Sequence, residues 1–444
     1  MANRPNQALS RLLAESGLSE TQFAHAVNRV AAETGVAARY GQPSVSQWLS
    51  GTTPRAPVRP LVAEVLSRRL GRSVTPAELF PTAPSGPAPA QTPYARTVEE
   101  LVDLVRSDMD PSRRGVVGAG LYSVALTIPG WRDVVGRMDA VRSGRLRRIG
   151  MADVQAVSDM TERLSELDDR FGGRYARPMS AAFISHTVAP YLRADGPEKV
   201  RKAMLSAASF LCYLTGWMAV DEGLHGLAQR YYVKGLELAG ASSDHLTYCH
   251  ILRGMSVQAA DLGHGRVARQ LADAAAEASS SVTPRMQAFF AGQQAHSYAV
   301  AGDRRQALAA IRATETLMEK AESRANVFGG YNPSTVFYHL AQVRYELGDV
   351  PGSIESLRAH FRLRVDGDSR RSSVRFRAMM AERLLEIGHL EAACESWNRC
   401  LDEYPAVHSG RADEHVRRIS RILHPYRTNP LARSVLNRAR EATV

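Results

Sequence analysis

Cysteine is scarce in this chain. The 444 residues include only four cysteines, at positions 212, 249, 394 and 400, and no two of them stand in a CxxC or similarly close spacing. Neither a disulfide framework nor a zinc site of the common types is therefore expected. The four side chains predict small buried thiols in a reducing compartment.

Long apolar runs are also missing. The first residues lack the apolar segment of a secretory signal, and the weakly polar stretch from Gly115 to Trp131 is broken by Pro129 and is too short to cross a bilayer. We therefore expect a cytoplasmic protein with no membrane-spanning segment.

The common catalytic motifs are absent as well. The sequence contains no Walker-type phosphate loop, no HExxH and no GxSxG. Gly118-Ala119-Gly120 begins like a dinucleotide fingerprint, but Ser123 stands where the third glycine is required, so a helix-packing role is favoured. The histidines are scattered. We expect no enzymatic activity, no cofactor and no metal ion.

Lysine is nearly absent, although the chain is basic. The formal net charge is +11, and only four of the 56 basic residues are lysines. An arginine bias of this kind is typical of a GC-rich genome. The charge is therefore compatible with a polyanionic partner but does not identify one.

Proline is concentrated in residues 81–93, where five prolines occur in thirteen residues (PTAPSGPAPAQTP). This composition favours polyproline II and predicts a semi-rigid spacer of about 40 Å when extended. The segment divides the chain into a helix-turn-helix head at residues 1–80, a linker at 81–93, a helical region with degenerate leading repeats at 94–200, and a repeat array at 201–444.

The head predicts five short helices. Ser19 with Gln22 and Thr75 with Glu78 have the spacing of capping boxes, and a glycine follows most of the predicted helix ends. Apolar residues at helical spacing give each helix one buried face. Five short helices in about eighty residues fit a helix-turn-helix domain.

Residues 43–50 predict the recognition helix of this domain. Val45, Trp48 and Leu49 share one face, so the polar residues of this helix, none of them acidic, turn outward toward a major groove. The Gln47 amide suits adenine, the serines suit a base or a phosphate, and Gln42 caps the helix. Simple exposure to solvent is the alternative for each residue. The predicted DNA-binding residues are Arg39, Gln42, Ser44, Ser46, Gln47, Ser50, Arg55 and Arg59.

Glycines recur at a nearly constant interval beyond residue 200. They stand at positions 223, 263, 302, 348 and 388, with spacings of 40, 39, 46 and 40. A small residue follows each glycine five positions later, which lets two helices approach closely. The expected fold class is all-α: an N-terminal helix-turn-helix domain followed by a tetratricopeptide-like α-solenoid. An unrelated helical bundle is the alternative.

Several segments resemble a known family. They are residues 26–40, 44–51, 54–55 and 66–71 in the head, residues 217–221 and 228–232 in the array, and DDRFGGR at 168–174 between them. Residues 295–307 and 388–405 resemble the tetratricopeptide repeat, although the period here exceeds the usual length of about 34 residues. The chain thus resembles actinobacterial Xre/Cro-type helix-turn-helix regulators with C-terminal tetratricopeptide-like repeats. The resemblance implies a sequence-specific transcriptional regulator.

The resemblance also implies a ligand groove, because solenoids of peptide-sensing regulators hold a peptide on their concave side. Aromatic and polar groups there suit an extended peptide or a small ligand, and ordinary packing is the alternative. The first-helix positions that would line the groove are Tyr213, Trp217, His250, Arg253, His296, Tyr338, Gln342, Arg375 and Glu382.

Three functional hypotheses are compatible with these sequence features. The leading one is a transcriptional regulator that binds double-stranded DNA as a homodimer and is located at the nucleoid when it is bound. Its solenoid would mediate dimerisation and sense a signalling peptide, a small ligand or a partner protein. The alternative is a tetratricopeptide scaffold or adaptor that holds a partner protein and uses the head for docking. An RNA-binding protein is the third.

Overall fold

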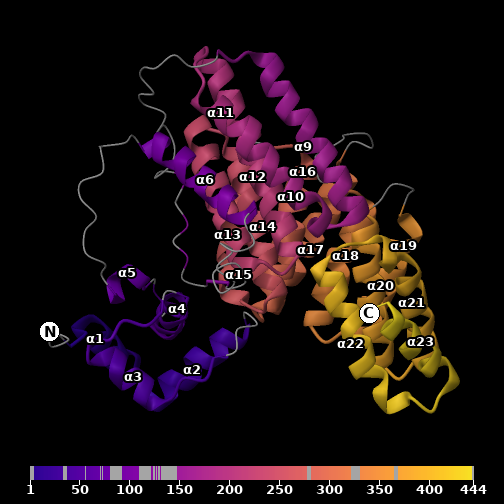
Figure 1. Ribbon diagram of the computed structural model, residues 1–444. Helices are drawn as coiled ribbons and strands as arrows, with labels where there is room; N and C mark the ends of the chain where they lie inside the picture. The colour runs from indigo at the N-terminus through magenta and orange to yellow at the C-terminus, as the bar shows by residue number, and fades with distance from the viewer. Residues whose placement is uncertain are drawn as a thin grey trace.

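The computed structural model describes residues 5–33, 38–55, 57–70, 72, 74–80, 93–109, 122–123, 126, 128, 131, 148–277, 282–321, 331–364 and 369–442. Within these ranges the chain is helical, and the one β interaction is an isolated bridge between Arg148 and Asp195. A small head and a much larger helical array are visible in Figure 1. The predicted all-α class is confirmed.

The head is a cluster of short helices around one core. Phe23, Trp48 and Leu66, which come from three different helices, are all buried in it. Its helices are α1 (Gln7–Ser16), α2 (Glu20–Glu33), α3 (Gln42–Leu49), α4 (Arg59–Leu70) and α5 (Pro76–Leu79).

The capping residues of the head explain where its helices begin. The Ser19 N–H donates to Gln22 Oε1 at 3.0 Å, and the Gln22 N–H donates to Ser19 Oγ at 3.2 Å, so the predicted capping box is present. Before α3, however, the N-cap is Gly41. The prediction that Gln42 caps this helix is wrong, because Gln42 is already its first helical residue.

The segment between the head and the array is described only in part. Residues 81–92 of the predicted linker and the glycines at 118 and 120 lie outside the described residues. Pro93 does not belong to a linker, because it is the first residue of α6 (Pro93–Met109), where its fixed φ favours a helix start. The helix is held to the array by Thr97, whose hydroxyl donates to Glu237 at 2.8 Å.

The array consists of antiparallel helix pairs. It starts with α9 (Met151–Phe171) and α10 (Gly173–Phe183), which a π-helical segment (Ile184–Val188) and α11 (Ala189–Arg193) continue. The pairs that follow are α12 (Glu198–Asp221) with α13 (His225–Ser242), α14 (His245–Asp261) with α15 (Gly265–Ala276), α16 (Pro284–Val300) with α17 (Arg304–Glu319), α18 (Pro333–Glu346) with α19 (Val350–Leu363), α20 (Arg370–Glu386) with α21 (Leu390–Glu403), and α22 (Gly410–Leu423) with α23 (Pro430–Glu441).

The recurring glycines form the turns inside these pairs. All five have φ between 76° and 83°, the left-handed region in which a side chain is strained. The small residues five positions later are fully buried between the two helices of each pair. The glycine pattern therefore identified the helix pairs correctly.

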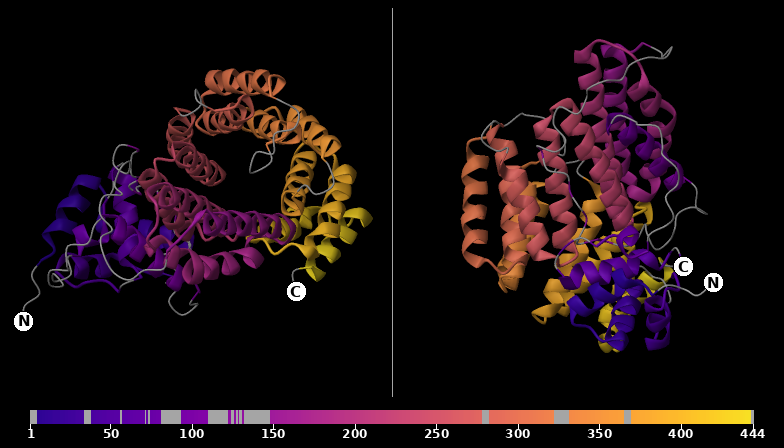
Figure 2. Two further views of the ribbon diagram at one scale, coloured as in Figure 1. Left: turned by 90° about the horizontal axis from the view of Figure 1, so that it is seen from above. Right: turned by 90° about the vertical axis from the view of Figure 1, so that its left-hand side faces the viewer.

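The array curls until its C-terminal pairs contact its first pair (Figure 2, left). The His408 N–H donates to the Phe171 carbonyl at 2.6 Å, and Arg174 donates to Asp413 at 2.8 Å. Between them, Gly172 has φ 92°, and a Cβ there would meet the His408 carbonyl oxygen at 2.5 Å. The DDRFGGR segment at 168–174 is thus the place where the array closes, which the sequence did not predict.

A short segment connects the head to the array. The Ser123 hydroxyl donates to Glu64 of α4 at 2.6 Å, and its backbone N–H and carbonyl each pair with the Gln229 side-chain amide of α13 at 2.8 Å. The neighbouring Tyr122 ring stacks on His264 at 4.8 Å. The head is therefore attached to the first half of the array.

One helix among the described residues, α12, is long and apolar enough by length and composition to cross a membrane. Its most apolar window is 72% buried inside the fold. A central helix of a helical array has the same property, because both of its faces pack on neighbouring helices.

A candidate ligand cavity in the closed array

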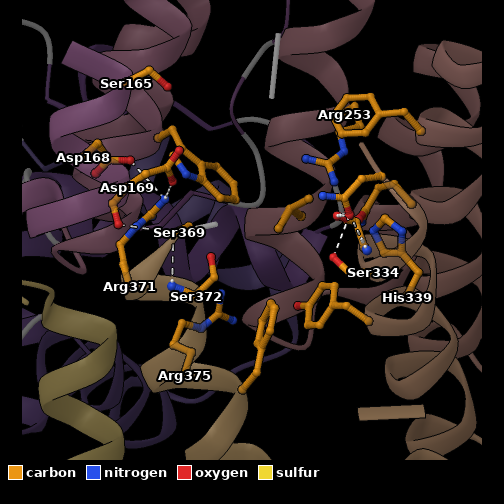
Figure 3. Close-up of a pocket in the computed structure, with 18 of the residues that line it drawn as sticks. Ser165, Asp168, Asp169, Arg253, Ser334, His339, Ser369, Arg371, Ser372 and Arg375 are labelled. Carbon is orange, nitrogen blue, oxygen red and sulfur yellow. Dashed lines mark hydrogen bonds and ion pairs between the residues drawn. The ribbon is translucent and has the colours of Figure 1, made fainter. Parts of the chain in front are cut away.

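Closure of the array leaves a cavity of about 390 Å³ at its centre (Figure 3). Its walls come from α9, α12, α14, α16, α18, α19 and α20 and consist mainly of aromatic rings, arginines and histidines. The volume lies in the range of about 300–1,000 Å³ that is usual for small-molecule sites.

One wall is the ion-pair cluster that closes the array. Arg371 of α20 contacts Asp168 at 3.0 Å, Asp169 at 3.3 Å and Asp221 at 3.4 Å. Burial raises the pKa of Asp168 to about 7 in spite of Arg371. Burial would also raise the pKa of Asp221, but Arg371, Arg411 and the Gly173 N–H outweigh it and hold that pKa below its usual value.

The cluster extends along α14, α20 and α22. Asp261 accepts from Arg411 at 3.1 Å and from Arg375 at 3.4 Å. The guanidinium of Arg411 also lies 5.1 Å from the centre of the Trp217 ring. Each of these arginines therefore has at least one carboxylate partner, and the closure is held by charge pairs from helices that are far apart in sequence.

The opposite wall is built differently. The guanidinium of Arg253 lies 4.0 Å from the centre of the Phe289 ring, and the side chain is 8% exposed. His250, His296 and His339 surround it. Burial and the positive charge of Arg253 lower the pKa of His250 to about 3, and burial lowers that of His296 to about 4 and that of His339 well below its usual value. These imidazoles are therefore uncharged at neutral pH.

The structure brings most of the predicted groove residues together around this cavity. Gln342 is an exception, because it lies one turn beyond Tyr338 and its Oε1 accepts from Arg383 at 2.6 Å. Glu382 and Gln342 line a neighbouring cavity of about 340 Å³. The predicted residues that line the central cavity are Tyr213, Trp217, His250, Arg253, His296, Tyr338 and Arg375.

Sequence reasoning missed the residues that close the cavity. Asp168 and Asp169 lie in the DDRFGGR segment, which carries a family resemblance but no motif of a binding site. Arg371 precedes Arg375 by one helical turn, so the two guanidinium groups lie on one face of α20. That spacing was the available signal, but nothing in the sequence indicated that α9 would be their partner.

The predicted DNA-binding residues form a polar surface on the head. Gln42, Gln47, Ser50, Arg39 and Arg55 are exposed.

The remaining three are half-buried, and two of them are held by neighbours. The Ser46 hydroxyl donates to Glu20 of α2, and Arg59 Nε donates to the Pro54 carbonyl at 2.9 Å. The third is Ser44. Although α3 carries no acid, the Glu20 carboxylate therefore lies beside it.

In the part of the chain that the structure describes, no group of three or more histidine, cysteine, aspartate or glutamate side chains is arranged to hold a metal ion. The four cysteines are free and buried, as predicted.

Taken together, fold and cavity define an all-α helical-repeat protein with a central cavity of ligand size and a separate helical head. Residues 9–80 match the family described as SP15 N-terminal domain, a match confined to the head. Among solved structures, the P58(IPK) TPR domain is similar at 17% identity, over 66% of this chain and 89% of that chain, with a TM-score of 0.18. So low a TM-score means that the two do not superpose globally. No curated protein matches the chain.

Proposed function

We propose that this chain is a helical-repeat adaptor that holds a partner molecule in the central cavity of its array and uses its head to dock on a second partner. The observation that carries the proposal is the closure by Arg371, because it turns a curved array into a ring of helices with a cavity at its centre. A space of about 390 Å³ lined by rings and arginines suits the burial of a small molecule or a chain terminus.

Site-specific photo-crosslinking tests this proposal. Benzoylphenylalanine in place of Ser372, which lines the cavity, is expected to give one discrete adduct in host cells. The same residue in place of Leu308, which is exposed on α17, is the control and is expected to give none. Intact-protein mass spectrometry reads out both. Adducts of equal yield at the two positions, or none at either, would contradict the adaptor proposal.

A second candidate concerns what the head docks on. Its α2 and α3 are successive helices packed on one core. Gln47 of α3, the C-cap residue Ser50 and Arg55 are all exposed. This arrangement supports a helix that enters a DNA major groove. On this hypothesis the protein is a cytoplasmic transcriptional regulator, and a homodimer binds two half-sites on DNA. The array would sense the molecule that its central cavity holds.

Duplex binding distinguishes this candidate. Gln47→Ala combined with Arg55→Ala is expected to weaken binding to upstream DNA of neighbouring genes by about tenfold or more and to reduce the salt slope by about 1. Arg72→Ala is the control, because Arg72 contacts Glu15 and Glu78 instead of lying on α3. Fluorescence anisotropy over a salt series measures both. Equal affinity for a random duplex, or tighter binding to a matching RNA, would rule out sequence-specific DNA binding.

A further inference from the structure

We propose that the central cavity binds an organic acid, with Arg253 as the ion-pair partner of its carboxylate. The proposal rests on the proposed function, because it names the ligand chemistry of the same cavity. It is independent of what the head docks on.

The first argument is the state of Arg253 itself. The side chain is 8% exposed, its Nε is buried with no hydrogen-bond partner, and no ion pair to it is found among the described residues. It does hydrogen-bond to the Tyr213 hydroxyl, which is a neutral group. A buried charge without a counter-ion is costly, so such a group calls for an anion.

The second argument is the charge of the rest of the cavity. Arg371 and Arg375 already contact Asp168, Asp169, Asp221 and Asp261, so their charges are compensated within the protein. The histidines near Arg253 are neutral for the reasons given above. Arg364, which also lines the cavity, donates to the Ser369 carbonyl at 3.3 Å on the side of Arg371. Beside the neutral histidines, Arg253 is the positive charge that no carboxylate of the described residues contacts.

The third argument is the shape of the ligand that fits. Phe289 lies under the guanidinium, and the Tyr338 and Phe376 rings stack with centres 4.1 Å apart further along the wall. Rings of this kind bind an apolar or aromatic body by area burial and stacking. The ligand is therefore an acid with an apolar or aromatic part, either a small molecule or the carboxyl end of a peptide.

A matched pair of fluorescent dyes tests the anion requirement on the full chain. Anilinonaphthalene sulfonate carries one anionic group on an aromatic body, and phenylnaphthylamine is the same body without the charge. Arg253→Met is expected to weaken sulfonate binding by about tenfold or more, the loss typical of a removed charge-assisted contact. Binding of the neutral dye is expected to change by less than about twofold.

Two further variants keep this test decisive. Arg253→Lys retains the charge and is expected to restore most of the sulfonate affinity. Arg312→Met removes an exposed arginine on α17, outside the cavity, and is expected to leave both dyes unaffected. Thermal melts by circular dichroism confirm that each variant is folded. No sulfonate binding, an unchanged affinity in Arg253→Met, or an equal loss for both dyes would overturn the proposal.

Displacement of the dye identifies the source of the carboxylate. Phenylpropionate and the peptide acetyl-Gly-Gly-Phe both place a carboxylate near a phenyl ring. Displacement by phenylpropionate alone supports a small acid, and displacement by the peptide alone supports a chain terminus. If the corresponding amides displace the dye as strongly as the acids do, the proposal that the cavity binds a carboxylate is contradicted. A crosslink at position 372 together with an unchanged sulfonate affinity in Arg253→Met would contradict this inference and leave the adaptor proposal intact.

Discussion

Arg371→Met is expected to lower the free energy of unfolding of the array by about 3–5 kcal/mol, the cost typical of removing one partner from a buried charge cluster. Arg371 is 4% exposed, and its loss leaves the carboxylates of Asp168 and Asp221 buried without it. Urea denaturation followed by circular dichroism measures the effect.

The control for this experiment is Arg399→Met. Arg399 pairs with Glu395 one turn away, and both side chains are more than half exposed. Exposed pairs of this kind contribute about 0–1 kcal/mol, so little change is expected. Equal destabilisation by the two variants would show that the cluster at Arg371 does not hold the array closed.

Acidification from pH 6.5 to pH 5.5 is expected to lower the free energy of unfolding by about 2 kcal/mol. The pKa values of His225, His250 and His296 are lowered in the folded state to about 4, 3 and 4 by burial. The unfolded chain therefore binds more protons below pH 6.5, so stability is lost as the pH falls toward 4. Asp168, whose pKa is raised to about 7, acts in the opposite direction over the same range and offsets one histidine.

Denaturation midpoints at pH 6.5 and pH 5.5 measure this slope. A variant with His250→Gln and His296→Gln removes two of the responsible groups and is expected to flatten the dependence. A slope that stays the same in this variant would show that these two histidines are not held neutral by the fold.

The sequence was most informative where structure is local. The turn glycines need a left-handed backbone, and Ser19 with Gln22 needs only four consecutive residues to form its capping box. Signals of this kind do not depend on the rest of the fold. The prediction for Gln42 failed because Gly41 satisfied the start of α3 without a side chain, which a preference for polar caps does not anticipate.

The site was predictable only in part, for a geometric reason. Positions on the first helix of each pair point to the concave side, which placed residues such as Trp217 and Arg253 correctly. Gln342 was predicted wrongly because it lies one turn beyond Tyr338 on α18, where its side chain contacts Arg383 of α20 instead of the cavity. The closure itself depends on Asp168 and Arg371, which are 203 positions apart. Curvature accumulated over many helices decides whether they meet.

A double-mutant cycle between Asp168 and Arg371 tests the closed array most directly. The variants are Asp168→Asn, Arg371→Met and the two combined, and the free energy of unfolding is measured for each. A coupling energy of about 1–3 kcal/mol is expected, because contacting groups in one buried network do not act additively. Additivity within about 0.5 kcal/mol would contradict the ion pair between Asp168 of α9 and Arg371 of α20, and with it the closure of the array.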